Sequence, residues 1–301
     1  MKKHRTTETS NEKSLLLDEW SSFEIVQFMN QEDGGITNAV KEALPMIALA
    51  VDGIVDRWKL GGRIFVIGAG TSGRLGVVDA VELVPTFSIE EDRWIGILAG
   101  GYEAMWTSLE ETEDDEQLIQ STLEDYNFSA RDVLIGVTAS GSTPFVLAAI
   151  HYGKERNGLT IGISNNENTK LSSICDYGIE AITGPEVIRG STRLKAGTAQ
   201  KMVLNMLSTA SMVRVGKVYR NEMVDMKLIN NKLVYRAVQT LMNATDLSEA
   251  DAARILKEND HNLKVSIFRV LTGGTKEDSL HYLGEADGHI KHAIQLYYQK
   301  N

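Results

Sequence analysis

The sequence predicts an α/β protein with a doubly wound, mainly parallel five-stranded sheet, N-terminal helices and a small C-terminal all-helical subdomain. Short β-rich runs alternate with helical patterns through the middle of the chain, which is the pattern of βαβ crossovers. The β signal stops after Gly197, and helical patterns follow. The 301 residues, 43% of them hydrophobic, suffice for one large domain or for a large and a small one.

The N-terminal part is expected to be helical. Between residues 37 and 58 the apolar residues recur at spacings of three and four, which is the stripe of an amphipathic helix. Pro45 lies inside this pattern and is expected to bend the helix. We therefore predict a helical segment over residues 1–58 that packs on the core.

Five β-rich runs predict the sheet of a central domain over residues 59–218. In a doubly wound sheet, ligands bind beyond the carboxyl ends of the strands, so the loops that follow the runs are the candidate site. The expected strands cover residues 63–67, 94–98, 133–138, 159–164 and 178–182.

The last third of the chain is expected to be helical throughout. Residues 198–215 predict a long buried helix, and residues 219–301 form a separate helical region. A change of composition suggests a small helical subdomain from about residue 246, for which Asp246 and Ser248 are candidate N-caps.

Composition excludes several classes of function. A formal net charge of −10 argues against a nucleic-acid partner. Cys175 is the only cysteine, so no intramolecular disulfide can form, and without a Cys/His cluster neither a metal site nor another cofactor is expected. The N-terminus is polar and no apolar run approaches about 20 residues, so a cytoplasmic protein without a membrane partner is expected.

A glycine-rich loop follows the first expected strand and opens a helix, with the sequence IGAGTSGRLG over residues 67–76. Its backbone amides could bind a phosphate at the positive end of the helix dipole. The loop also fits the dinucleotide pattern GxGxxG, but the next strand ends without the acidic residue that would hold a ribose. Dinucleotide binding and a purely structural turn stay open as alternatives. The candidate phosphate-binding residues are Gly70, Thr71, Ser72 and Gly73.

A second loop, VTASGSTP over residues 137–144, is rich in hydroxyl groups and also connects a strand to a helix. Two such loops could hold one phosphate between them. The alternative is that Ser142 or Thr143 only caps the helix that follows. The candidate binding residues are Thr138, Ser140, Gly141, Ser142 and Thr143.

These loops, in this order, resemble the flavodoxin-like sugar isomerase domain of proteins that bind phosphosugars. Longer signatures resemble the N-acetylmuramic acid 6-phosphate etherase family, and the similarity covers about residues 5–297, including Thr6-Thr7-Glu8 and Asn11. The related glucokinase regulatory protein shares the signature but is roughly twice as long. The signatures are residues 68–80, 85–87, 99–101 and 184–201.

The resemblance implies a homodimeric, metal-independent lyase. Such an enzyme cleaves the lactyl ether of N-acetylmuramic acid 6-phosphate, giving N-acetylglucosamine 6-phosphate and D-lactate in cell-wall recycling. The reaction needs a base for the proton on carbon 2 and an acid for the departing oxygen, and Glu82 and Glu113 match the family's positions for them. Apolar neighbours favour Glu82 as the acid and leave Glu113 as the base, although the two roles could be exchanged. By its residues alone, the acidic run around Glu113 favours a solvated helix face.

The signature over residues 184–201 supplies further candidates for the sugar pocket or a dimer contact: Glu186, Ser191, Arg193 and Lys195. Capping and charge pairing before a helix explain them equally well. The chain departs from the family pattern around Glu82 and in the second loop, so substrate preference could have changed. A non-catalytic phosphosugar sensor and an aldose–ketose isomerase remain as alternatives. The departures are Val81, Leu83, Val84, Ser88 and Ser142.

Overall fold

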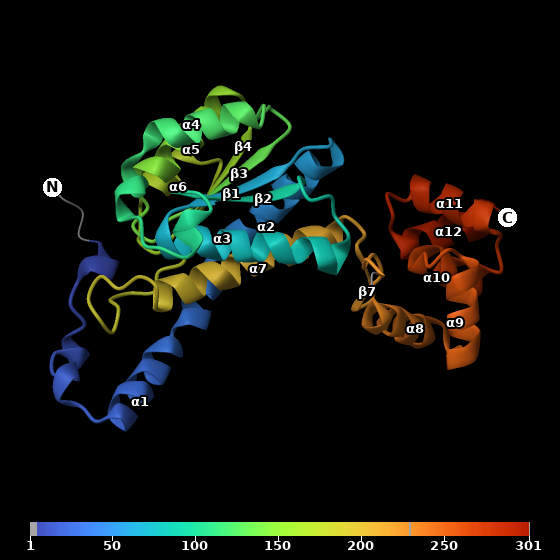
Figure 1. Ribbon diagram of the computed structural model, residues 1–301, viewed down its shortest axis with the longest axis horizontal. Coiled ribbons are helices and arrows are strands. Elements are labelled where there is room, and N and C mark those ends of the chain that lie inside the picture. The colour runs from blue at the N-terminus through green and yellow to red at the C-terminus, as the bar shows by residue number, and fades with distance from the viewer. Residues whose placement is uncertain (1–4, 229, 301) are drawn as a thin grey trace. The chain divides into compact units, whose positions relative to one another are not determined.

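The computed structural model describes residues 5–228 and 230–300. The chain divides into two compact units (Figure 1). The first runs up to Val81 and continues over Glu91–Ser208, and the second holds Glu82–Glu90 and continues from Thr209. In the described ranges, no helix is both long and apolar enough to span a membrane.

A five-stranded parallel sheet forms the centre of the first unit, as predicted. The strand order is β2-β1-β3-β4-β5, which is the flavodoxin-like order with its switch point between β1 and β3. Each strand lies within two residues of its expected position, because buried parallel strands are continuous apolar runs. The strands are β1 (Ile64–Gly68), β2 (Trp94–Leu98), β3 (Val133–Val137), β4 (Leu159–Ser164) and β5 (Tyr177–Glu180).

The register of the sheet places the two glycine- and hydroxyl-rich loops side by side. Gly68, the last residue of β1, pairs with Leu98 of β2 and with Val137 of β3. The carboxyl ends of these three strands are therefore level. Since β1 and β3 are neighbours, the loops that leave them begin next to each other.

Helices cover both faces of the sheet, with α2, α3 and α7 on one face and α4, α5 and α6 on the other (Figure 1). The long helix expected over residues 198–215 is present as α7, and Pro45 lies inside α2. All residues of β1 and β3 are buried between the two layers. The helices are α2 (Ile36–Lys59), α3 (Gly70–Phe87), α4 (Glu116–Asp125), α5 (Pro144–Glu155), α6 (Lys170–Ile174) and α7 (Lys195–Arg214).

Short helical turns precede α2. Helix α1 (Ser22–Asp33) begins at a capping box. The Ser21 hydroxyl accepts a hydrogen bond from the Glu24 backbone N–H, and the Glu24 carboxylate accepts one from the Ser21 backbone N–H. The 3-10 turns of the first unit are η1 (Thr6–Glu8), η2 (Glu12–Ser14), η3 (Leu17–Glu19), η4 (Glu103–Met105) and η5 (Glu110–Asp114).

The second unit is a helical bundle with its own core, in which Leu241 and Phe268 are fully buried. Ser248 caps α9 as expected, whereas Asp246 does not start a helix: it ends α8 in a left-handed conformation with φ of 59°. The sequence did not predict an antiparallel hairpin, because two-residue strands carry no periodicity. The elements are β6 (Val218–Tyr219), β7 (Glu222–Met223), α8 (Asn231–Thr245), α9 (Glu249–Glu258), α10 (Leu263–Thr272), α11 (Lys276–Glu285) and α12 (Ile290–Lys300).

The expected domain limits at residues 58, 218 and about 246 stay predictions. The division between the compact units falls inside α3 and inside α7, so the helix continues through the division at both places.

Candidate active site

A cavity of about 530 Å³ lies at the carboxyl end of the sheet, and we call it the central cavity. The loops after β1 and β3 both line it, as the register requires. Polar side chains dominate its wall, so it suits a hydrophilic ligand. Besides Ala69, Val137 and Ala139, the lining residues are Glu8, Gly70, Thr71, Ser72, Arg74, Ser108, Glu110, Glu113, Thr138, Ser140, Thr143, Ser191, Thr192 and Arg193.

The second loop presents a cluster of connected hydroxyl groups. The Thr138 hydroxyl lies 3.1 Å from that of Ser140 and 2.7 Å from that of Thr143. The Ser142 hydroxyl donates to Ser140 Oγ at 3.1 Å. Thr143 occupies the N-cap position of α5, but its side chain makes no capping hydrogen bond. Its hydroxyl therefore belongs to the cluster, and hydroxyls that can rotate to donate together suit a phosphate.

Glu113 lies directly over the first loop. Gly70 has φ of +51°, and a Cβ added there would come within 3.3 Å of Glu113 Oε1. Burial, followed by the nearby charges of Glu110 and Asp114, raises the pKa of Glu113 above its ordinary value. The carboxyl group is thus half-buried against the loop and is not on a solvated helix face.

Arg74, from the first turns of α3, holds the loop that leads to Glu113. Its Nε donates to the Ala104 carbonyl at 2.9 Å and its Nη2 donates to the Thr107 carbonyl at 3.1 Å. Two bonds from one planar guanidinium fix both position and orientation. The arginine of the glycine-rich signature therefore positions the segment that carries Ser108 and Glu113.

Glu82 occupies a different place. It lies on α3, 12 residues beyond Gly70, and it is exposed. At 1.5 Å per residue the helix carries it about 18 Å along its axis from the first loop. It is not among the residues that line the central cavity. Its catalytic role stays a prediction.

Three other expected binding residues have structural partners. Glu186 is fully buried, and its two oxygens accept the amide hydrogens of Lys195 and Ala196 at the start of α7. Lys195 is also buried, and its Nζ lies 2.8 Å from Glu32 Oε2. Gly73 packs against the Gly68 carbonyl, which leaves no room for a Cβ. These three residues do not line the central cavity. The contacts of Glu186 and Lys195 are those of the capping and pairing alternative, and the binding role of all three residues stays a prediction.

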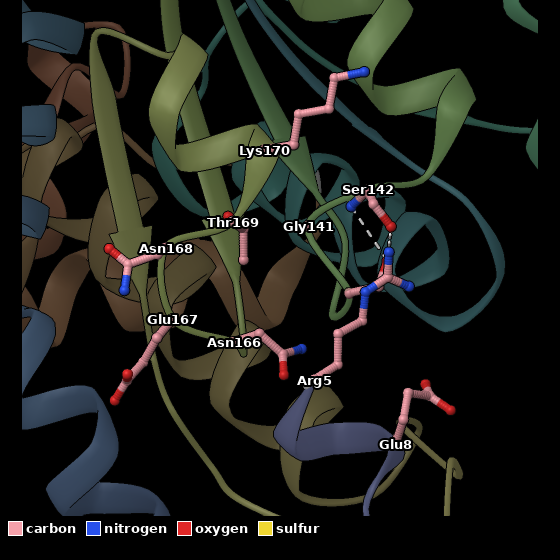
Figure 2. A pocket seen from close by; sticks show the side chains of 10 residues that line it. Arg5, Glu8, Gly141, Ser142, Asn166, Glu167, Asn168, Thr169 and Lys170 are labelled. Carbon is pink, nitrogen blue, oxygen red and sulfur yellow. Dashed lines mark hydrogen bonds between the residues drawn. The ribbon is translucent and has the colours of Figure 1, made fainter. Parts of the chain in front are cut away.

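A second cavity, of about 670 Å³, adjoins the second loop, and we call it the side cavity (Figure 2). Ser140, Gly141 and Ser142 line it together with the segment of residues 166–170 that follows β4. Figure 2 shows Arg5 extending from the N-terminal turn towards Ser142. Ser140 and Glu8 line both cavities.

Sequence reasoning missed several of the cavity residues. Arg74 belongs to the recognised signature, and Thr192 lies between two candidates, so their positions in those motifs were the available signal. Ser108 lies in a loop without a motif, and no pattern distinguishes it. Glu8 was part of the Thr6-Thr7-Glu8 resemblance, but nothing in the sequence connects that turn with the loops.

The fold and the hydroxyl-lined cavity define a protein built on the sugar isomerase (SIS) domain. A family model described as the glucokinase regulatory protein N-terminal SIS domain matches residues 46–154, and the SIS domain model matches residues 109–210. The two matches together span the sheet and both loops.

Similar proteins narrow this class to one family. An N-acetylmuramic acid 6-phosphate etherase 2 of Bacillus licheniformis is 55% identical, over 97% of this chain and 98% of its own. An N-acetylmuramic acid 6-phosphate etherase 2 of Vibrio cholerae is 45% identical, over 97% of this chain and 95% of its own. An N-acetylmuramic acid 6-phosphate etherase of Actinobacillus succinogenes is 46% identical, over 96% of this chain and 95% of its own. The chain belongs to the N-acetylmuramic acid 6-phosphate etherase family.

Proposed function

We propose that this chain is a carbon–oxygen lyase that cleaves the lactyl ether of N-acetylmuramic acid 6-phosphate, giving N-acetylglucosamine 6-phosphate and D-lactate in cell-wall sugar recycling. The observation that carries the proposal is the central cavity, which is lined both by a hydroxyl cluster and by a half-buried carboxyl group. The membership in the etherase family supports the same substrate. A phosphorylated amino sugar fits the polar wall.

The charges of the lining residues suggest which of them hold the phosphate. Glu8, Glu110 and Glu113 would repel a phosphate dianion, whereas the hydroxyls around Thr138 and the amides of the first loop can donate to it. We therefore assign the phosphate to the loops, with Thr71, Ser72 and Ser140 among its ligands. The sugar ring then extends towards Glu113.

Glu113 is the proposed base. Once the ring opens, the aldehyde acidifies the proton on carbon 2, and the Glu113 carboxylate removes it. The electrons form the double bond between carbons 2 and 3, the carbon 3–oxygen bond breaks, and an acid protonates the departing lactate oxygen. Water then adds to the unsaturated aldehyde at carbon 3, and carbon 2 is reprotonated.

Glu82 is the proposed acid, and a homodimer is the proposed assembly. Carbon 2 and carbon 3 are adjacent atoms of one open-chain sugar, so the base and the acid must both lie within a few ångströms of that part of the substrate. About 18 Å of helix separates Glu82 from the first loop of its own chain. We therefore propose that Glu82 reaches the substrate from the second subunit. A cytoplasmic location completes the proposal.

The test is direct. Purified protein incubated with N-acetylmuramic acid 6-phosphate and a chelator should release D-lactate in equal amount to N-acetylglucosamine 6-phosphate. Glu113→Gln should abolish release while the protein still binds the product. Binding of the substrate by the unmodified protein without any lactate release would refute the lyase.

A binding-only role is the second candidate, and the match of residues 46–154 to a regulatory protein's domain favours it. The two candidates differ in turnover alone, so the lactate assay separates them. The isomerase alternative predicts a ketose from glucosamine 6-phosphate, and chromatography of that reaction tests it.

A further inference from the structure

The N-terminal turn η1 is attached to the second loop through one buried amide side chain. Thr7 is fully buried, and its backbone N–H donates to Asn166 Oδ1 at 3.3 Å. Asn166 Nδ2 donates in return to Thr7 Oγ1 and to the Ala139 carbonyl, each at 2.9 Å. Ala139 lies between Thr138 and Ser140 of the hydroxyl cluster. The turn is thus fixed to the phosphate-binding loop itself.

This attachment places Glu8 at the wall of the central cavity. The backbone carbonyl of Glu8 accepts a hydrogen bond from Arg189 Nε at 2.8 Å, which secures the end of the turn. A Cβ added to Gly190 would lie 3.5 Å from Glu8 Oε2, and the residues that follow Gly190 line the same cavity. Two carboxyl groups, those of Glu8 and Glu113, therefore line the central cavity. Each lies close to a glycine in the left-handed conformation, Gly190 for Glu8 and Gly70 for Glu113.

The Glu8 carboxyl group is available to a ligand. The residue is exposed, and within the described part of the chain its side chain has no hydrogen-bond or ion-pair partner. A carboxylate accepts hydrogen bonds and repels a phosphate dianion. The groups of an amino sugar that suit it are the hydroxyls and the amide N–H.

We propose that Glu8 is a substrate-binding residue that accepts hydrogen bonds from a hydroxyl or the amide N–H of the sugar, and so sets specificity for the sugar rather than for its phosphate. The inference rests on the proposed function for the identity of the sugar. The N-terminal turn is accordingly a wall of the site.

Glu8→Ala tests the proposal, with Glu12→Ala as the matched control, because Glu12 is an exposed glutamate of the next turn that lines neither cavity. Loss of a charge-assisted hydrogen bond should raise KM for N-acetylmuramic acid 6-phosphate roughly 10- to 100-fold. Glu8→Gln should lose less, because its amide oxygen still accepts. Inhibition by inorganic phosphate should stay within about twofold of the unmodified protein, because phosphate contacts the loops.

Two outcomes would overturn the inference: an unchanged KM in Glu8→Ala, or an equal loss of phosphate and sugar binding, which would indicate that the turn only supports the loop. If the unmodified protein releases no lactate, calorimetric binding of N-acetylglucosamine 6-phosphate replaces KM as the measurement. An unchanged dissociation constant in Glu8→Ala then overturns the inference by itself, and the proposed lyase has failed separately.

Discussion

Gly70→Ala should damage catalysis much more than folding. A Cβ at φ of +51° costs about 1–2 kcal/mol of folding free energy, and the stiffer unfolded chain offsets about 0.4–1 kcal/mol of that. The net loss is therefore about 1 kcal/mol. The new methyl group would also lie 3.3 Å from Glu113 Oε1, so the carboxyl group must move by a few tenths of an ångström. Because a shift of about 1 Å can cost about 100-fold in rate, we expect kcat to fall roughly tenfold.

Gly61→Ala is the matched control. Gly61 has φ of +79°, and a Cβ there would meet nothing within 4 Å. Urea unfolding should give both variants similar losses of stability, while lactate release should show the kcat loss only in Gly70→Ala. In a Glu113→Asp background, whose shorter carboxylate avoids the methyl group, the additional loss from Gly70→Ala should shrink. Equal turnover of Gly70→Ala and Gly61→Ala would refute the placement of Glu113 over the loop.

Two further predictions follow from charged groups. Burial and then the charge of Glu110 raise the pKa of Glu113, and a base must be ionised, so activity should be lost on acidification already at a pH above the ordinary glutamate pKa. Glu110→Gln should move this acid limb of the kcat profile to lower pH, and an unmoved limb would contradict the reasoning. Burial alone would raise the pKa of Asp132, but hydrogen bonds from Arg63 and from the Ser129 amide outweigh burial and lower it. The ionised carboxylate therefore stabilises the folded protein above the pKa that Asp132 has in the unfolded chain. This contribution is lost as the pH falls through the pKa that Asp132 has in the folded protein. Asp132→Ala should cost about 3–5 kcal/mol in urea unfolding at neutral pH, and a cost under about 1 kcal/mol would argue against the buried pair.

The sheet could be predicted because both of its faces are covered. Strands such as Val133–Val137 are then continuous apolar runs between turn signals, and their order follows from the resemblance of the loops. The position of the two glycine- and hydroxyl-rich loops was predictable for a related reason: loops that follow parallel strands gather at one edge of the sheet. The hairpin of β6 and β7 had no such signal.

The rest of the candidate site depends on long-range contacts that a local pattern cannot contain. The hydrogen bonds between Thr7 and Asn166 join residues 159 positions apart, so the approach of Glu8 to the loops was invisible in the sequence. Glu186 and Lys195 illustrate a different difficulty. A charged pair before a helix suits a ligand or a cap equally well, and the sequence does not show that the two residues are buried with partners of their own.

The attachment of η1 to Asn166 also affects how the protein should be handled. A tag or a deletion close to Arg5 would act within a few residues of Thr7, whose turn carries Glu8 at the wall of the central cavity. Such a change could alter kinetic constants without any visible loss of folding. Affinity handles and immobilisation chemistry therefore belong on the helical bundle of the second unit, which has a core of its own.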